Sequence, residues 1–301
     1  MPVILFVVER EEPVHRCLSR ALMMARYLKV PLQITLCGLR AAGASDSAAA
    51  SHVAEEAREY LQALRKSIIA PDVEITTEIA RAGPLAEVIA GRAREGGAAL
   101  IIKPPSLGHM LGRNRTDWQL MQSCPSPLLL TEGRSWHPQA QFAAAVDVMD
   151  PNQTKCRAII AAAAALRLAC AAELDLIYAQ PENSRNQASE GESPAQLRLT
   201  QLGREFDIEP QHLHLLSGSA KEMLRDFVTE KQYDLLVIGA PQRSGTLFSR
   251  ARESPLALSM AAIGCDLLIV NHRETGTDSA LRARPRFRWD GTPWWQWIGA
   301  D

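Results

Sequence analysis

Short, continuous apolar runs alternate along the chain with longer segments whose apolar residues recur at helical spacing. In the first half these runs predict strands near 2–8, 32–37, 73–79, 99–103 and 127–131. In the second half they predict strands near 142–147, 174–178, 211–216, 234–239 and 266–270. Strands that are apolar throughout, rather than at every second position, are typical of a parallel sheet covered by helices on both faces.

The two halves of the chain repeat each other. Residues 83–89 (GPLAEVI) recur as residues 218–224 (GSAKEML), at an offset of 135 residues. Each half also opens with an apolar strand that ends in an acid, Glu9 or Asp147. The pattern predicts an α/β protein of two tandem doubly wound domains, each a five-stranded parallel sheet with helices on both faces. We expect domains at 1–132 and 140–272, and polar surface loops at 41–52 and 181–194.

The composition narrows the class of protein. Hydrophobic residues make up 47% of the chain and the net charge is −1 at pH 7, which is typical of a soluble globular protein and argues against a nucleic-acid partner. No run reaches the roughly 18 apolar residues of a membrane span, and no signal peptide opens the chain, so we expect a cytoplasmic protein. The six cysteines form no C-x-x-C pair, and we interpret them as reduced, buried thiols.

The strand ends locate the candidate site. In an open parallel sheet, ligands bind beyond the carboxyl ends of the strands, where the strand order reverses. Glu9 and Asp147 end the first strands, and Pro104-Pro105 and Gly239-Ala240 follow the fourth strands. Glycine lets a backbone approach a ligand, whereas proline offers no N–H to an anion. The second half therefore has the better site, unless Asp147 is a solvated strand end and Gly239 a turn glycine.

Each half resembles a domain of the universal stress protein family, in its strand-terminal acid, its helix start and its closing apolar strand. The most specific matches are Thr116-Asp117-Trp118, Cys124-Pro125-Ser126-Pro127 and Cys265-Asp266-Leu267-Leu268. The resemblance covers roughly 1–132 and 140–272. It implies a tandem stress-response protein with the fold of the adenine nucleotide alpha hydrolases, and it makes ATP with Mg²⁺ the cofactor to test.

Members of that family that bind ATP carry a G-x2-G-x9-G-[S/T] loop after the fourth strand. In the second half Gly239 matches the first glycine and Ser254 the hydroxyl position. Gln242 and Glu253 replace the other two glycines, and a carboxylate beside a triphosphate is electrostatically unfavourable. In the first half Asn114-Arg115 occupies the last two positions, and we expect no ordinary ATP site there.

The resemblance gives the second half a set of candidate ligand-binding residues, namely Asp147, Gly239, Ala240, Arg243, Gly245 and Ser254. Arg243 and Gly245 would compensate for the degraded loop by holding an anionic group. Ser254 is equally placed to cap a helix that begins at Pro255.

Catalysis has no positive support in the sequence. There is no nucleophile elbow, no H-E-x-x-H motif and no Walker loop, so we predict no catalytic residue. His212 and His214 lie two apart on an expected strand and can share a metal, but no third ligand is apparent, so we predict no metal site.

Three functions are compatible with these observations. The leading one is a ligand-binding or regulatory module that takes a small molecule or a nucleotide in its second domain. The first alternative is a weak ATPase that uses Asp147 for the metal and Ser254 for a phosphate. The second alternative is a docking scaffold that uses the tail at 273–301.

That tail is rich in arginine and tryptophan and holds four of the six tryptophans of the chain. Indoles are rarely left in water, because each buries a large apolar area. We expect the tail to pack over a domain, over a partner copy in a homo-oligomer, or on another protein.

Overall fold

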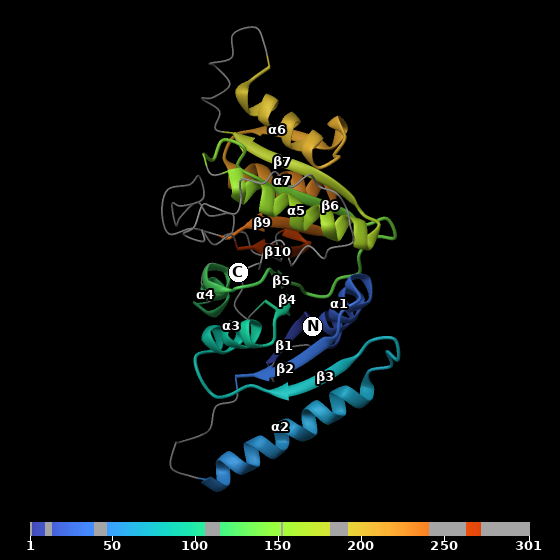
Figure 1. The fold of residues 1–301 in the computed structure, drawn as a ribbon, viewed down its shortest axis with the longest axis vertical. Helices are drawn as coiled ribbons and strands as arrows, with labels where there is room; N and C mark the ends of the chain where they lie inside the picture. The colour runs from blue at the N-terminus through green and yellow to red at the C-terminus, as the bar shows by residue number, and fades with distance from the viewer. Residues whose placement is uncertain are drawn as a thin grey trace. The chain divides into compact units, whose positions relative to one another are not determined.

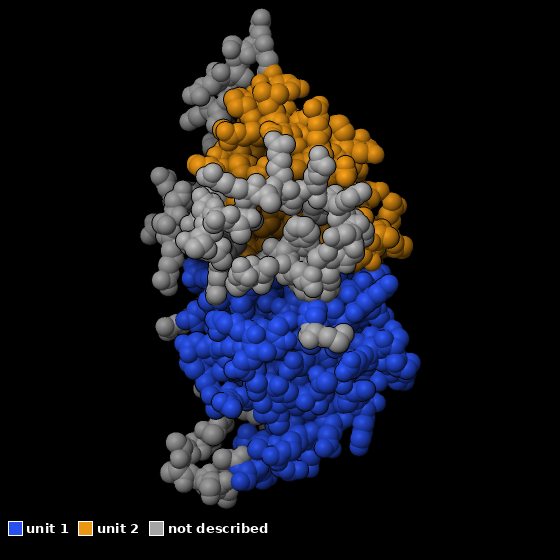
Figure 2. Space-filling model, viewed as in Figure 1, with its two compact units in different colours: residues 1–135 blue, residues 136–301 orange. Residues whose placement is uncertain are grey.

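The computed structural model of the protein describes residues 2–9, 14–38, 47–105, 115–151, 153–180, 192–240 and 263–271. The chain divides into two units, residues 1–135 and 136–301, which we call unit 1 and unit 2 (Figure 2). Each unit has its own strands and helices (Figure 1). No helix among the described residues is long and apolar enough to cross a membrane.

Unit 1 is built on parallel strands. They are β1 (Val3–Glu9), β2 (Leu32–Cys37), β3 (Ile75–Ile79), β4 (Ala98–Lys103) and β5 (Leu128–Leu130). Their order is β3-β2-β1-β4-β5, and each neighbouring pair is parallel. The connecting helices are α1 (Val14–Leu28), α2 (Ser47–Ser67), α3 (Leu85–Glu95) and α4 (Arg115–Ser123). The chain runs outward from β1 to β3 and then crosses back to β4, so the strand order reverses between β1 and β4.

Unit 2 has the same order of strands. They are β6 (Gln141–Ala145), β7 (Glu173–Gln180), β8 (Leu213–Ser217), β9 (Leu235–Gly239) and β10 (Asp266–Val270). Their order is β8-β7-β6-β9-β10, again with parallel neighbours. The described helices of unit 2 are α5 (Gln153–Cys170), α6 (Pro194–Glu205) and α7 (Ala220–Lys231). The order reverses here between β6 and β9.

Helices lie on both faces of the sheet in unit 2 (Figure 1). Side chains alternate between the faces of a strand, and β7 shows which helix covers which face. Tyr178 lies within electrostatic reach of Cys156 in α5. Asp175, three residues earlier and therefore on the other face, accepts a hydrogen bond from Tyr233, which follows α7. This is the arrangement that right-handed crossovers produce when the chain reverses direction along a sheet.

The strands form where the apolar runs predict them, and their burial explains why the runs are continuous. Every residue of β4 and β10 is buried. In both strands the buried set includes one ionisable side chain, Lys103 or Asp266. A charge in such a position requires a partner.

Three expected boundaries are wrong. The surface loop expected at 41–52 overlaps α2, which begins at Ser47, because the run of alanines there has the highest helix propensity. The strand expected at 211–216 begins at Leu213, since Pro210 opens a turn of 3-10 helix over Pro210–His212. The strand expected at 142–147 ends at Ala145, so Asp147 lies in the loop beyond the strand.

Candidate functional site

The structure brings two of the predicted site positions to one edge of the sheet in unit 2. Strands β6 and β9 are parallel neighbours, with Ala145 opposite Ile238. Asp147 follows the end of β6, and Gly239 is the last residue of β9. The order of strands reverses between these two, which is where open α/β sheets bind ligands. We call this edge the strand-end crevice of unit 2.

The carboxylate of Asp147 has only backbone partners among the described residues. Its Oδ1 accepts a hydrogen bond of 3.1 Å from the N–H of Met149. Burial raises the pKa of the Asp147 carboxyl above its ordinary value, and the charge of Asp150 adds to this rise, whereas backbone N–H groups lower it in part. No arginine or lysine in the described part of the chain is within 4.0 Å of this carboxylate. The Asp147 carboxylate can therefore accept a hydrogen bond from a ligand or bind a cation.

Gly239 and Ala240 are held by packing. A Cβ built on Gly239 would lie 2.9 Å from Cδ1 of Ile159 in α5, and the N–H of Ala240 donates to the carbonyl of Val270 over 2.9 Å. The close approach of β9 to α5 is thus sufficient reason for a glycine here. The other predicted residues, Arg243, Gly245 and Ser254, lie outside the described residues, as does the tail at 273–301.

The corresponding edge of unit 1 holds a cation of its own. Lys103 ends β4 and is fully buried. Its Nζ lies 2.9 Å from Oε1 of Glu9 and 3.4 Å from Oδ1 of Asp117 in α4, and it donates to the carbonyl of Pro104 over 2.8 Å. The acid that ends β1 is therefore neutralised from within the chain.

Lys103 was not among the predicted site residues, although it directly precedes Pro104 and Pro105. The available signal was a lysine closing an otherwise apolar strand, beside a strand that itself ends in an acid. A buried ammonium is tolerated only beside a carboxylate or similar group, so that pairing was predictable in principle.

Two cysteines lie beside these strand ends, and neither is a nucleophile. Burial raises the pKa of Cys37 to about 12, and the charges of Glu9 and Glu78 contribute. Burial, with the charge of Asp147, likewise raises the pKa of Cys156 to about 12. Both are protonated thiols near neutral pH, in line with the interpretation of the cysteines as reduced, and all six are free of disulfides.

A second polar cluster joins β7, the 3-10 turn before β8, β8 itself and the segment between α7 and β9. Asp175 lies between the two histidines, 2.6 Å from Nδ1 of His212 and 2.9 Å from Nε2 of His214. Tyr233 also donates to the carboxylate. The sequence analysis found the histidines but not the acid between them. One ring nitrogen of each histidine contacts the carboxylate, and the described residues contain no group of three or more potential ligands arranged to hold a metal ion.

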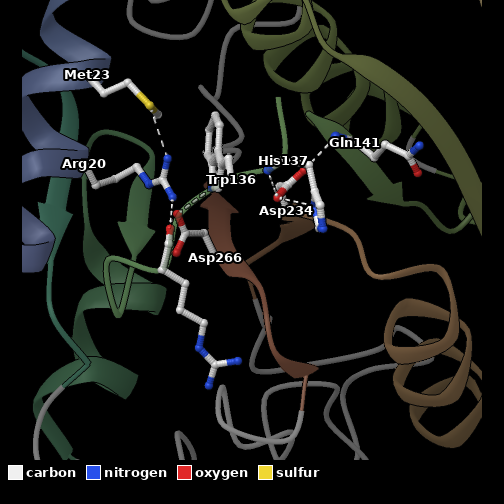
Figure 3. A network of polar contacts seen from close by, with 8 residues as sticks. Arg20, Met23, Trp136, His137, Gln141, Asp234 and Asp266 are labelled. Carbon is white, nitrogen blue, oxygen red and sulfur yellow. Dashed lines mark hydrogen bonds and ion pairs between the residues drawn. The ribbon is translucent and has the colours of Figure 1, made fainter. Parts of the chain in front are cut away.

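A third buried network fixes the entry of the chain into unit 2 (Figure 3). Oδ1 of Asp234 accepts from the N–H of His137 and lies 2.9 Å from its Nδ1, while Oδ2 accepts from the N–H of Gln141 over 2.9 Å. Beside it, Nε1 of Trp136 donates to Asp266 over 3.0 Å. These residues lie at the amino ends of β6, β9 and β10, away from the crevice, so the network anchors the chain.

Residues 144–249 match a family model, the Universal stress protein family. No curated protein matches the chain. The match begins at the end of β6 and includes Asp147 and Gly239, so it covers the strand-end crevice of unit 2.

Among solved structures, a functionally unknown protein from Pseudomonas aeruginosa PAO1 has a TM-score of 0.65 at 22% identity, over 90% of this chain and 92% of its own. A putative universal stress protein from Pseudomonas aeruginosa UCBPP-PA14 has a TM-score of 0.64 at 22% identity, over 90% of this chain and 93% of its own. A universal stress protein from Archaeoglobus fulgidus DSM 4304 has a TM-score of 0.64 at 14% identity, over 90% of this chain and 97% of its own. The chain thus contains a Universal stress protein family domain at residues 144–249 and shares its α/β fold with solved proteins of that kind.

Proposed function

We propose that the protein is a tandem stress-response module that binds a small molecule in the strand-end crevice of unit 2 and acts as a regulatory protein. The observation that carries this proposal is the contrast between two acids at equivalent strand ends. Glu9 has the ammonium of Lys103 at 2.9 Å, whereas Asp147 has backbone N–H partners and a raised pKa. An acid at a strand end that has no counter-ion among the described residues is suited to a ligand.

The first unit is, in this proposal, a second domain of the same family that has lost its site. Its strands have the same order as those of unit 2, and the repeat at 83–89 and 218–224 supports a duplication. The domains then occupy 1–132 and 140–272. Lys103 and Pro104 stand where a ligand-binding copy needs an open strand end.

The chemistry of Asp147 limits the ligand. A half-buried carboxylate binds hydroxyl or amino groups that donate to it, or a divalent cation. A nucleoside offers such donors, and Mg-ATP is therefore the first probe. Gln242 and Glu253 in the loop argue against tight binding of the triphosphate, so adenosine is the second probe.

The test is isothermal titration of the full chain with Mg-ATP and with adenosine. Asp147→Asn keeps the shape of the side chain and removes the charge, and it is expected to weaken binding about tenfold or more. Glu9→Gln is the matched control at the equivalent strand end, and its affinity should equal that of the wild type.

Without ligand, the urea midpoint of Asp147→Asn should be at least as high as that of the wild type. The substitution removes a carboxylate whose charged form is disfavoured by burial. If neither probe binds, native mass spectrometry of the purified protein follows. A co-purified molecule lost in Asp147→Asn supports the proposal. A wild type that carries and binds nothing, or a variant that binds as well as the wild type, refutes it.

A further inference from the structure

A second pocket in unit 2 adjoins the loop that follows β6. Its volume is about 200 Å³, and its polar lining consists of Asp150, Gln153, Arg157, Arg198 and Gln201. The loop, the first turns of α5 and the middle of α6 contribute these residues. We propose that this pocket binds a small oxyanion, a phosphate or a short carboxylate, and that Arg198 is the residue that binds it.

The charges around the pocket leave one cation in excess. Arg157 is paired with Glu205 through two hydrogen bonds, of 2.7 and 3.0 Å. Lys155 lies 3.8 Å from Oδ2 of Asp150. Arg198 makes no ion pair among the described residues, so the pocket has a net positive charge that attracts an anion.

Arg198 also has hydrogen-bonding capacity to spare. Its described contacts use only Nη1, which lies 3.3 Å from the carbonyl of Val148 and 3.9 Å from the sulfur of Met149. A guanidinium carries five N–H donors in a planar fork that matches a carboxylate or a phosphate. No described residue uses the remaining donors, which can form a charge-assisted pair of hydrogen bonds with an oxyanion.

The volume decides the size of the ligand. Pockets for drug-sized molecules measure about 300–1,000 Å³, so about 200 Å³ is too small for a nucleotide. It accommodates inorganic phosphate or a dicarboxylate of a few carbons. The amide of Gln201, on the same helix as Arg198, can add a neutral N–H donor to an oxyanion held in the pocket.

The pocket and the strand-end crevice share one loop. The carbonyl of Val148 accepts hydrogen bonds both from Arg198 and from Nε2 of Gln153, at 3.3 and 3.1 Å. One residue earlier, the carbonyl of Asp147 accepts from the N–H of Asp150 over 3.1 Å. An anion that draws Arg198 toward itself therefore acts on the loop that positions Asp147.

The experiment titrates the full chain with sodium phosphate and, separately, with sodium succinate, at constant ionic strength set with sodium chloride. Heat of binding and the melting temperature are both recorded. Arg198→Gln should bind at least about tenfold more weakly than the wild type. Arg204→Gln, the same change of charge on the exposed part of α6 outside the pocket lining, should bind like the wild type. Tighter binding of phosphate would indicate a phosphate ligand, and tighter binding of succinate would indicate a short carboxylate.

Gln201→Glu is a second variant at an exposed position, so folding is preserved while a negative charge enters the pocket. It should also lose binding. Asp147→Asn should retain it, which separates this pocket from the crevice. The proposal is overturned if the wild type gives no saturable response to either anion, or if Arg198→Gln and Arg204→Gln respond alike.

Discussion

Lys103 shows how a single side chain decides whether a strand end is open. Moving an ammonium from water into the interior costs several kcal/mol even after relaxation, and only close carboxylates and hydrogen bonds offset that cost. Lys103 has both, in Glu9, Asp117 and the carbonyl of Pro104. Its side chain is 0% exposed, so water contributes nothing to its solvation.

We expect Lys103→Met to destabilise the protein by about 3–5 kcal/mol, because the change leaves two carboxylates beside each other without their cation. Urea unfolding measures this, and Lys66→Met on the exposed end of α2 is the control, with a change below about 0.5 kcal/mol. Adding Glu9→Gln and Asp117→Asn to Lys103→Met should restore much of the loss. If Lys103→Met alone were as stable as the Lys66→Met control, the ion pairs of Lys103 would contribute little to the free energy of unfolding.

At the scale of elements, Asp175 in β7 holds β8 through His214 and the segment after α7 through Tyr233. Burial alone would raise the pKa of this carboxyl, but the hydrogen bonds from His214, Tyr233 and His212 together outweigh burial and hold it below the ordinary value of 3.8. The contribution to stability is complete above pH 3.8, and it is lost as the pH falls through the lower pKa of the folded state.

Asp175→Asn is therefore expected to cost about 1–3 kcal/mol near neutral pH. The difference from the wild type should shrink as the pH falls below 3.8, because the wild-type carboxyl then takes up its proton. Urea midpoints at a series of pH values measure both effects. Asp226→Asn, on the exposed surface of α7, is the control. A difference that stays constant with pH would contradict the lowered pKa.

The end of unit 1 depends on a contact between its last segment and α1. Gly133 has a φ of +68°, and a Cβ there would lie 2.3 Å from the carbonyl carbon of Arg16. Because that atom belongs to the backbone of a helix, it cannot move aside as a side-chain tip would.

Gly133→Ala should therefore destabilise unit 1 by about 3 kcal/mol or more, through strain at the positive φ together with the clash. Gly38 is a matched control, since its φ is +78° and a Cβ there would meet nothing within 4 Å. Gly38→Ala should cost about 1–2 kcal/mol, from the backbone alone. If both variants lost the same free energy of unfolding in urea, the backbone at Arg16 would be able to move away from the added Cβ at little cost.

At the scale of the molecule, periodicity and the internal repeat predicted the strands because burial on both faces leaves a direct mark on the sequence. The end of β6 was predicted within two residues for the same reason, with Asp147 in the loop that follows. Asp175 and Asp234 were not found, since each is recognised only by partners 37 to 97 residues away, as with Asp234 and His137 at a separation of 97 residues. Pairings of this kind depend on tertiary contacts that no local pattern records.

The internal cation of unit 1 also bears on how the protein responds to concentration. A molecule that binds only the folded state stabilises it in proportion to the logarithm of its own concentration. Lys103 is tethered beside Glu9 and is present at the same effective concentration under every condition. Under the proposed function, the stability that unit 2 gains from its ligand varies with the concentration of that ligand, whereas the contribution of Lys103 to unit 1 does not. If unit 1 is a second copy of the same domain, as we propose, one copy carries a fixed internal cation while the other responds to the supply of its ligand.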